Sequence, residues 1–408
     1  MPLNKLVRSA ALFWGLVVCM PVGMNYFAFF ALAACMLLQG GRLERVRRVR
    51  GHPLFWPLVF YVAWTAVVLV LQPRLYAETA SNLWHGGRIV ATLLLALALT
   101  REEAVWAAGG FVLAVAYGVL VIVLHQTVGL PELPVWRNLV SYSGNKSISN
   151  AILMALLAGS ALVLALVSTG RSRWVCDGVA LILLAVVVVA LPNRTAQLVV
   201  LCALPAAAVH QWRGHKRKLV VVVALAVLAS AAFVAAVPTV RERLAQGVQE
   251  IRQGSEGEVA MASWNLRVQM IRHTSRMVFE RPWMGWGIGA WNDQWRKRVP
   301  PLIADLNMPH NDLLWMGAQA GVPGALAWLA IMLAACRVGW TRQDLTGRLA
   351  FVAALTLLLS ALVNSATRDA VIGLGLLWVV GVYLRLAADP GFRVRFPGVA
   401  RTPGAPDA

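Results

Sequence analysis

His310 is the residue whose type best suits proton transfer. It lies in the run Met308-Pro309-His310-Asn311-Asp312, directly before a long apolar stretch. An imidazole titrates near neutral pH, so it can act as a general base toward a hydroxyl group. A purely structural role for a single histidine is the alternative. Asn311 and Asp312 are both residue types that cap helix N-termini, and we expect one of them to begin the helix that follows.

Arg194 is a second residue whose type and place indicate chemistry. It stands in Leu191-Pro192-Asn193-Arg194-Thr195, a tight turn between two apolar runs. A guanidinium fixed at a membrane interface can bind a phosphate through two parallel hydrogen bonds. The alternative is an arginine that only extends its charged tip from a helix mouth into water.

Three further polar residues lie at the ends of expected helices. Arg88 and His85 are three residues apart, so they share one face of a helix expected over residues 82–99. The pair could serve either to pack the helix against its neighbours or to bind an anion, and the sequence leaves both alternatives open. Lys146 precedes a helix expected to begin near Ser149, whose N-terminal amides would also favour an anion.

Arg267 lies in a polar stretch, Pro238 to His310, that is far longer than a usual connection between helices. Helical periodicity predicts an amphipathic helix over Val240–Gln253 and a second helix from Ala260 to Glu280. On the second helix Arg267 points with the apolar stripe, which comprises Trp264, Met270, Ile271, Thr274 and Val278. We expect an opposite, polar face of Asn265, Gln269, Arg272, Arg276 and Glu280, with Arg276 paired to Glu280. An arginine in a buried stripe needs an anionic partner, so Arg267 indicates either a bound substrate anion or a structural ion pair.

The run Gly285-Trp286-Gly287-Ile288-Gly289 predicts a tight turn. It lacks the Lys-Ser/Thr of a phosphate-binding P-loop and the strand context of a dinucleotide site. Gly287 is therefore a supporting residue rather than a phosphate ligand. The tryptophans around this run predict an interfacial belt in preference to a sugar-stacking surface: Trp283, Trp286, Trp291 and Trp295.

The elements that must position these residues are membrane helices. The 408 residues are 59% hydrophobic and 13% charged, and apolar runs of about 20 residues recur along the chain. We predict an all-α polytopic membrane protein with twelve spans over residues 6–20, 22–38, 54–71, 82–99, 104–124, 149–168, 178–191, 195–210, 219–237, 311–336, 349–364 and 370–387.

The basic residues predict the topology. The two terminal segments and every second link between spans together hold 21 of the 37 Lys and Arg residues. The remaining short links and helix mouths hold only six: Arg74, Arg88, Arg137, Lys146, Arg194 and Arg368. Both termini are therefore expected in the cytoplasm, and the long polar loop is expected outside. The domain organisation follows as a bundle over 1–237, a loop domain over 238–310, three helices over 311–387 and a disordered tail over 388–408.

Composition also excludes some classes of function. The formal net charge is +19, but the cations follow the links between spans, so no nucleic-acid partner is expected. No Asp or Glu lies in the middle of an apolar run, which disfavours an ion-coupled transporter. The five cysteines lie in or beside apolar runs and show no disulfide or zinc spacing, and we expect no metal and no cofactor.

Together these features resemble the O-antigen ligase and polymerase superfamily. The resemblance rests on the single large outer loop, Arg194, the segment Trp264-Asn265-Leu266-Arg267, the Gly285–Gly289 run and Pro309-His310-Asn311 with Gly321 after it. Asn145, in Gly144-Asn145-Lys146, is similar to the family's Gly-Asn-x-Asn type of segment. Lys146 and the spacing to Asn150 depart from that pattern.

The resemblance implies a GT-C-like glycosyltransferase in the inner membrane of a Gram-negative bacterium. It would transfer a polysaccharide from undecaprenyl diphosphate to a sugar hydroxyl of lipid A-core, on the periplasmic face and among membrane lipids. His310 would be the general base, and Arg267 would be a second catalytic residue that stabilises the negative charge of the leaving diphosphate. Arg194, Arg88, Lys146 and His85 would bind the diphosphate. Asn311, Asp312, Asn145 and Gly287 would support the site. A polymerase or a protein oligosaccharyltransferase of the same superfamily is the alternative, and a lipid or polysaccharide transporter is a third.

Overall fold

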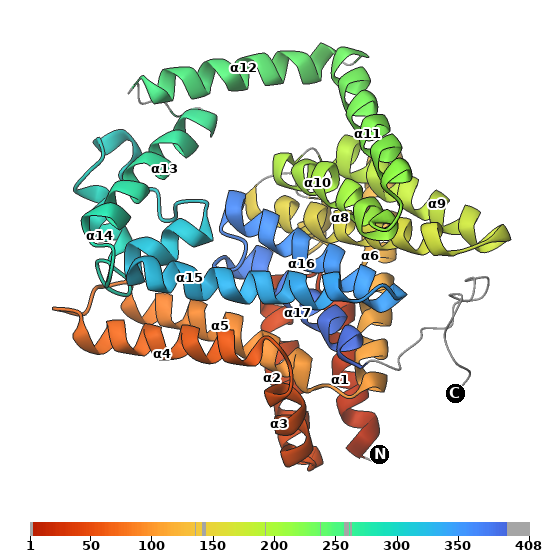
Figure 1. Ribbon diagram of the computed structural model, residues 1–408, viewed down its shortest axis with the longest axis horizontal. Helices are drawn as coiled ribbons and strands as arrows, with labels where there is room; N and C mark the ends of the chain where they lie inside the picture. The colour runs from red at the N-terminus through yellow and green to blue at the C-terminus, as the bar shows by residue number, and fades with distance from the viewer. Residues whose placement is uncertain are drawn as a thin grey trace.

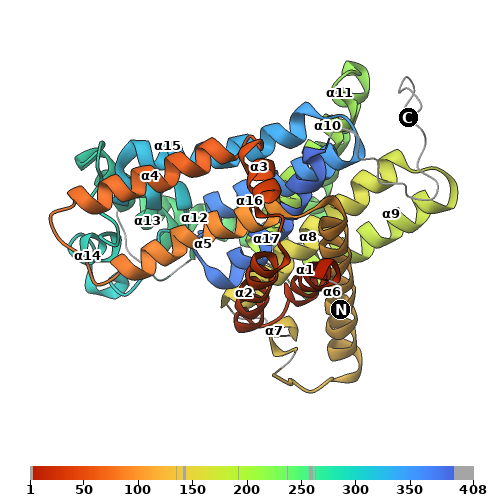
Figure 2. The ribbon, with the colours of Figure 1, turned by 90° about the horizontal axis from the view of Figure 1, so that it is seen from below.

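The computed structural model describes residues 3–134, 136–140, 144–191, 193–236, 238–256, 261 and 263–389, and within these ranges it contains helices, turns and connecting segments but no strand. Figures 1 and 2 show the arrangement from two directions. The expected disorder of the tail concerns residues that, from 390 onward, lie outside the described ranges.

All twelve predicted spans correspond to helices. The helices are α1 (Leu3–Val17), α2 (Val22–Gln39), α3 (Arg42–Arg50), α4 (Phe55–Leu71), α5 (Thr79–Ala98), α6 (Arg101–Val128), α7 (Arg137–Val140), α8 (Gly144–Val167), α9 (Gly170–Ala185), α10 (Arg194–Trp212), α11 (Lys216–Ala236), α12 (Pro238–Ser255), α13 (Ser263–Glu280), α14 (Trp291–Arg296), α15 (Asp312–Thr341), α16 (Leu345–Asn364) and α17 (Ala370–Ala388). A π-helical turn, Val186–Ala190, follows α9. The short helices α3, α7 and α14 lie in segments for which the sequence predicted only connections.

Eight described helices are each long and apolar enough to cross a membrane: α2, α6, α8, α9 with its π-helical turn, α10, α15, α16 and α17. The bent pair of α3 and α4 makes a possible ninth. The predicted class, an all-α polytopic membrane protein, is thereby confirmed. α1 falls short of this test because it has only 15 residues. α5 carries Asn82, His85 and Arg88, whose polarity lowers its hydropathy.

α17 is the central helix of the bundle. Apart from Arg385 near its end, its residues are apolar on all sides, and those from Ile372 to Ala387 are buried. A helix without a polar face is typical of a position surrounded by other helices. α5, α6, α8 and α16 pack around it. The indole of Trp378 stacks on Trp14 of α1, with 4.1 Å between the ring centroids.

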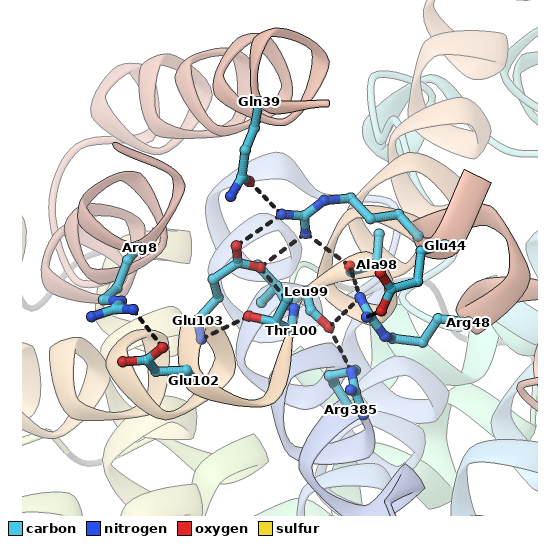
Figure 3. A network of polar contacts seen from close by, with 11 residues as sticks. Arg8, Gln39, Glu44, Arg48, Ala98, Leu99, Thr100, Glu102, Glu103 and Arg385 are labelled. Atoms are coloured by element: carbon cyan, nitrogen blue, oxygen red, sulfur yellow. Dashed lines mark hydrogen bonds and ion pairs between the residues drawn. The ribbon is translucent and has the colours of Figure 1, made fainter. Parts of the chain in front are cut away.

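One end of the bundle is closed by arginines that cover the end of α5. Arg45 of α3 donates two hydrogen bonds to the Glu103 carboxylate, at 2.9 and 2.8 Å. Figure 3 shows Arg48 and Arg385 directed at the carbonyl oxygens of Ala98 and Leu99, which they reach at 2.8 Å and 2.6 Å respectively. These bonds satisfy carbonyl groups that have no partner inside the helix. The cluster therefore joins α3, α5, α6 and α17.

The opposite end carries α13, α14 and the link between α4 and α5, which lie together at the left of both overall views (Figures 1 and 2). The Gly285–Gly289 run joins them. Its three glycines have positive φ angles of 64°, 105° and 87°. A side chain on Gly289 would come within 2.5 Å of the Thr79 backbone nitrogen at the start of α5. The predicted tight turn is confirmed, and it fixes where α5 begins.

Gly321 interrupts α15. Its φ of 70° breaks the helical backbone, and Val322 donates its amide to the Pro282 carbonyl at 2.6 Å. A side chain on Gly317 would meet Val278 of α13 at 3.0 Å. The small residues of α15 therefore allow the loop and α13 to pack closely against this helix.

The predicted faces of α12 and α13 are wrong in part. Asn265 and Gln269, expected on a solvated face, are buried, whereas Ile271 is 49% exposed. The reason is that α12 covers that side of α13, where Gln269 donates to the Gly254 carbonyl at 3.1 Å. On α12 the expected apolar stripe is exposed at Val248 and Ile251.

Two further expectations for the loop are also wrong. Glu280 forms its ion pair with Arg298, at 2.6 Å, and not with Arg276 as predicted. The chain folds back after the glycine run and brings Arg298 to Glu280. Trp291 and Trp295 are buried and stack on each other at 5.0 Å, so they form a core of the loop and not an interfacial belt. Trp283 is exposed.

Candidate active site

His310 stands between the loop and the helix bundle, with a left-handed backbone at φ 50°. The next residue, Asn311, is the N-cap of α15, and its side chain accepts the Leu314 amide at 2.9 Å. The His310 ring bonds through Nδ1 to Oδ1 of Asn364, at 2.9 Å. Asn364 is the last residue of α16, so the imidazole is held by two helix ends.

The Asn364 amide determines which nitrogen of His310 carries the proton. Its Nδ2 donates to the hydroxyl of Thr195, at 3.4 Å, so its Oδ1 faces the imidazole. A carbonyl oxygen only accepts hydrogen bonds, and Nδ1 of His310 must therefore be the donor. In the neutral ring the lone pair is then on Nε2. This is the arrangement that a general base requires.

Charges on both sides of His310 favour its neutral form. Burial lowers the pKa of the imidazole below its usual value, and the bond to Asn364 partly opposes this effect. The positive charges of Arg267 and Arg368 lower the pKa further, while Asp369 raises it. Burial and the two arginines thus favour the unprotonated form of the His310 imidazole.

Arg194 and Arg267 meet at one aromatic ring. The guanidinium carbons of Arg194 and Arg267 lie 5.5 Å and 5.6 Å from the Trp264 ring centroid. Arg194 is held at the start of α10, where Asn193 caps the helix by accepting the Thr195 amide at 2.9 Å. Burial and the charge of Arg194 lower the pKa of Arg267.

Neither guanidinium has an ion-pair partner among the described residues. This observation does not support the structural ion pair that was the alternative for Arg267. Two cations at one ring, without a carboxylate beside them, repel each other unless an anion binds. Arg194 and Arg267 therefore form a site suited to a substrate anion.

Arg88 is buried and bonds to the protein itself. It is 1% exposed. Its guanidinium donates to the hydroxyl of Tyr26 at 3.0 Å and to the carbonyl oxygens of Thr367, at 3.1 Å, and Arg368. These bonds hold the link between α16 and α17 in place.

His85, one turn before Arg88, lies within electrostatic reach of Arg88 and Arg368. Its Nε2 is 3.1 Å from the hydroxyl of Ser81. The shared helix face that the sequence predicted for His85 and Arg88 therefore points to the link between α16 and α17.

Asp312 is buried and fixes the same link. Its Oδ2 accepts the backbone amide of Thr367 at 2.7 Å and the Thr367 hydroxyl at 2.6 Å. The predicted supporting residues thus have separate tasks in the structure. Asn311 begins α15, Asp312 holds residues 365–369, and Gly287 lies in the turn at the start of α5, where it donates its amide to the Gln319 carbonyl at 3.0 Å.

Asn145 and Lys146 lie in the first turn of α8, which begins at Gly144 rather than near Ser149. Their side chains fall outside the part of the chain that the structure describes. Their predicted roles therefore stay predictions.

The sequence did not identify Trp264, Asn364 or Arg368 as site residues. Trp264 was assigned to an apolar stripe, and Asn364 ends an apolar run without any motif. The sequence did mark Arg368 as unusual, because it is one of only six cations in the short links and helix mouths expected on the outer side. That signal was not sufficient to place it beside His310.

The fold and the site define a class of protein, a polytopic helical membrane protein with a histidine and several arginines gathered at one end of the bundle. The model of the O-antigen ligase family matches residues 179–329, which include Arg194, Arg267 and His310. The predicted resemblance to the ligase and polymerase superfamily is thus confirmed over these residues, where the chain is similar to O-antigen ligases. A comparison with curated proteins finds no match.

Proposed function

We propose that the protein is an O-antigen ligase that uses His310 as general base. The observation that carries this proposal is the bond from Nδ1 of His310 to Asn364, which leaves Nε2 free to accept a proton, while Arg267 lies within electrostatic reach of the ring. The family match supports a reaction of the O-antigen ligase type. In this proposal the enzyme is a GT-C-like glycosyltransferase.

The donor is a polysaccharide on undecaprenyl diphosphate, and the acceptor is a sugar hydroxyl of lipid A-core. The acceptor oxygen attacks the anomeric carbon as Nε2 of His310 takes its proton. The bond from the anomeric carbon to the phosphate oxygen breaks, and undecaprenyl diphosphate leaves with the bonding electron pair. A single displacement of this kind inverts the anomeric centre.

The leaving diphosphate gains negative charge, which Arg194 and Arg267 stabilise. Preorganised cations act most strongly where charge develops in the transition state. Among the described residues, no group of three His, Cys, Asp or Glu side chains is arranged to hold a metal ion. We propose that the guanidinium charges of the two arginines neutralise the diphosphate without a metal.

The proposed setting is the inner membrane of a Gram-negative bacterium. The positive-inside pattern supports cytoplasmic termini and a periplasmic site. A polymerase or protein oligosaccharyltransferase would share the donor chemistry and differ in the acceptor. The acceptor that receives the glycan distinguishes these activities.

The decisive experiment uses protein reconstituted in liposomes with undecaprenyl-diphosphate glycan. Lipid A-core, free glycan and an acceptor protein are supplied separately, and the products are resolved on gels. We expect product with lipid A-core, and we expect the His310→Ala variant to lose at least about a hundredfold in rate. Activity should persist when EDTA is present.

The control is His215→Ala, since His215 is exposed in the turn between α10 and α11, far along α10 from Arg194. This variant should retain the rate of the unchanged protein. Full activity of the His310→Ala variant would refute the role of the histidine. Glycan uptake into vesicles without any bond formation would refute the transferase itself.

A further inference from the structure

Arg368 is a buried arginine that the proposed mechanism does not use. It lies in the link between α16 and α17 and is 7% exposed. Its guanidinium carbon is 5.6 Å from the ring centroid of Trp315, on α15. The backbone of this link is held by Arg88 and Asp312, so the position of Arg368 is fixed from two sides.

The guanidinium of Arg368 has no hydrogen-bond acceptor among the described residues, and its Nε is buried without a partner. Other buried arginines donate at least one guanidinium hydrogen bond to the protein, even where a further nitrogen is buried without a partner, as in Arg88 and Arg385. Arg45 bonds to Glu103, Arg88 bonds to Tyr26, and Arg385 bonds to the Leu99 carbonyl. A buried charge without a partner is costly, and a bound anion would remove that cost.

The carboxylates nearest to Arg368 are occupied by other donors. Asp312 accepts two bonds from Thr367. Asp369 caps α17 by accepting the amides of Val371 and Ile372 at 2.7 Å and 3.2 Å. Neither forms an ion pair with Arg368 in the described structure. They offset part of its charge from a distance, together with Glu78, while Arg88 adds positive charge.

Arg368 and Arg267 approach His310 from different elements. Both lie within electrostatic reach of the imidazole. Arg267 belongs to α13 of the loop and shares the Trp264 ring with Arg194. Arg368 belongs to the helix bundle and lies near His85 and Arg88. The base thus has cationic groups on its loop side and on its bundle side.

We propose that Arg368 is the centre of a second anion-binding subsite, on the bundle side of His310, that takes a phosphate or carboxylate group of a substrate. This inference rests on the proposed function. The anion has two possible sources with the same chemistry. One is the second phosphate of the lipid diphosphate donor, and the other is an acidic group on the acceptor saccharide.

The test compares Arg368→Gln with the unchanged protein in lipid nanodiscs. Affinity for undecaprenyl diphosphate is measured by native mass spectrometry, and the KM for lipid A-core is measured in the transfer assay. Loss of a charge-assisted hydrogen bond should weaken one of these constants by about tenfold to a hundredfold. Weaker binding of the lipid diphosphate assigns the subsite to the donor, and a raised KM assigns it to the acceptor.

The matched control is Arg272→Gln, which removes an exposed charge from α13 and should leave both constants unchanged. If Arg368→Gln does not fold, Arg368→Lys is used in its place. Lysine keeps the positive charge but cannot form the bidentate hydrogen bonds of a guanidinium, so this variant should still weaken binding several-fold. A folded Arg368 variant with both constants unchanged overturns the inference. If the unchanged protein neither binds the lipid diphosphate nor transfers glycan, it is the proposed function that fails.

Discussion

At the scale of single residues, Asn364 connects the chemistry to the fold. It accepts a hydrogen bond from Nδ1 of His310 and donates one to Thr195, beside Arg194. Thus one amide sets the tautomer of His310 and joins it to the helix end that carries Arg194, the proposed anion-binding residue. We regard Asn364 as a positioning residue, because it acts through His310.

Changes at Asn364 should move the pH dependence of transfer in opposite directions. In the proposed mechanism activity requires neutral His310, so it should be lost as the pH falls through the pKa of that imidazole. Asn364→Asp places a negative charge at the ring, which raises the pKa and moves the acidic limb to higher pH. Asn364→Leu removes a bond that raises the pKa, so the limb moves to lower pH, and kcat falls about tenfold because the tautomer is no longer fixed.

The measurement is the pH profile of kcat/KM for both variants. Asn292→Asp, near the glycine run, adds the same charge away from His310 and should leave the profile in place. A role confined to folding would lower the rate without moving the acidic limb. If neither Asn364 variant moves the limb, the group that titrates is not His310.

At the scale of elements, the loop positions the helices as much as the helices position the loop. The Gly285–Gly289 run lies against the link between α4 and α5, where Ile288 donates its amide to Gln72 at 2.7 Å. The Thr79 hydroxyl donates to the Ile288 carbonyl at 2.8 Å. These contacts fix the start of α5, and therefore the places of His85 and Arg88 further along it.

Gly289→Ala should destabilise the protein. The left-handed backbone at Gly289 costs an alanine about 1–2 kcal/mol, and its methyl group would lie 2.5 Å from the Thr79 nitrogen. We expect a clearly lower thermal unfolding midpoint in detergent.

Gly109→Ala is the control for this prediction, because nothing lies within 4 Å of the added methyl on α6. An alanine within a helix should stabilise it by up to about 1 kcal/mol relative to glycine. Equal unfolding midpoints for the two variants would contradict the close contact between the glycine run and α5.

At the scale of the whole molecule, polar clusters occupy opposite ends of the bundle. α5 and α17 both begin near the candidate site and end at the arginine cluster shown in Figure 3. Helices of 20 and 19 residues separate the two ends by about 30 Å. The cluster should therefore contribute to stability and not to chemistry.

Two neighbouring glutamates test this separation. Glu103→Gln leaves the buried Arg45 without its counter-charge and should cost on the order of 3 kcal/mol of stability. Glu102 pairs with Arg8 at an exposed position, so Glu102→Gln should cost less than about 1 kcal/mol. Both variants should transfer glycan at the unchanged rate below their unfolding temperatures, as measured by unfolding curves and the transfer assay. A Glu103→Gln variant that is folded but inactive would contradict the separation.

The sequence by itself determined the membrane helices, the glycine turn and a helix cap at Asn311 or Asp312. Each of these depends on a local property, such as hydropathy over about 20 residues, backbone freedom at glycine, or a side chain bonded three residues onward. For this reason all twelve predicted spans have a helix in the structure.

Only the tertiary structure decided which polar residues meet. Trp264 joins Arg194 to Arg267 across some 70 residues, and Asn364 reaches His310 across 54. The buried faces of α13, the partner of Glu280 and the isolation of Arg368 likewise depend on which element packs beside each one. Periodicity assigns a residue to one side of a helix, but it does not state what covers that side, and that covering decides whether an arginine is paired in the fold or left for a substrate.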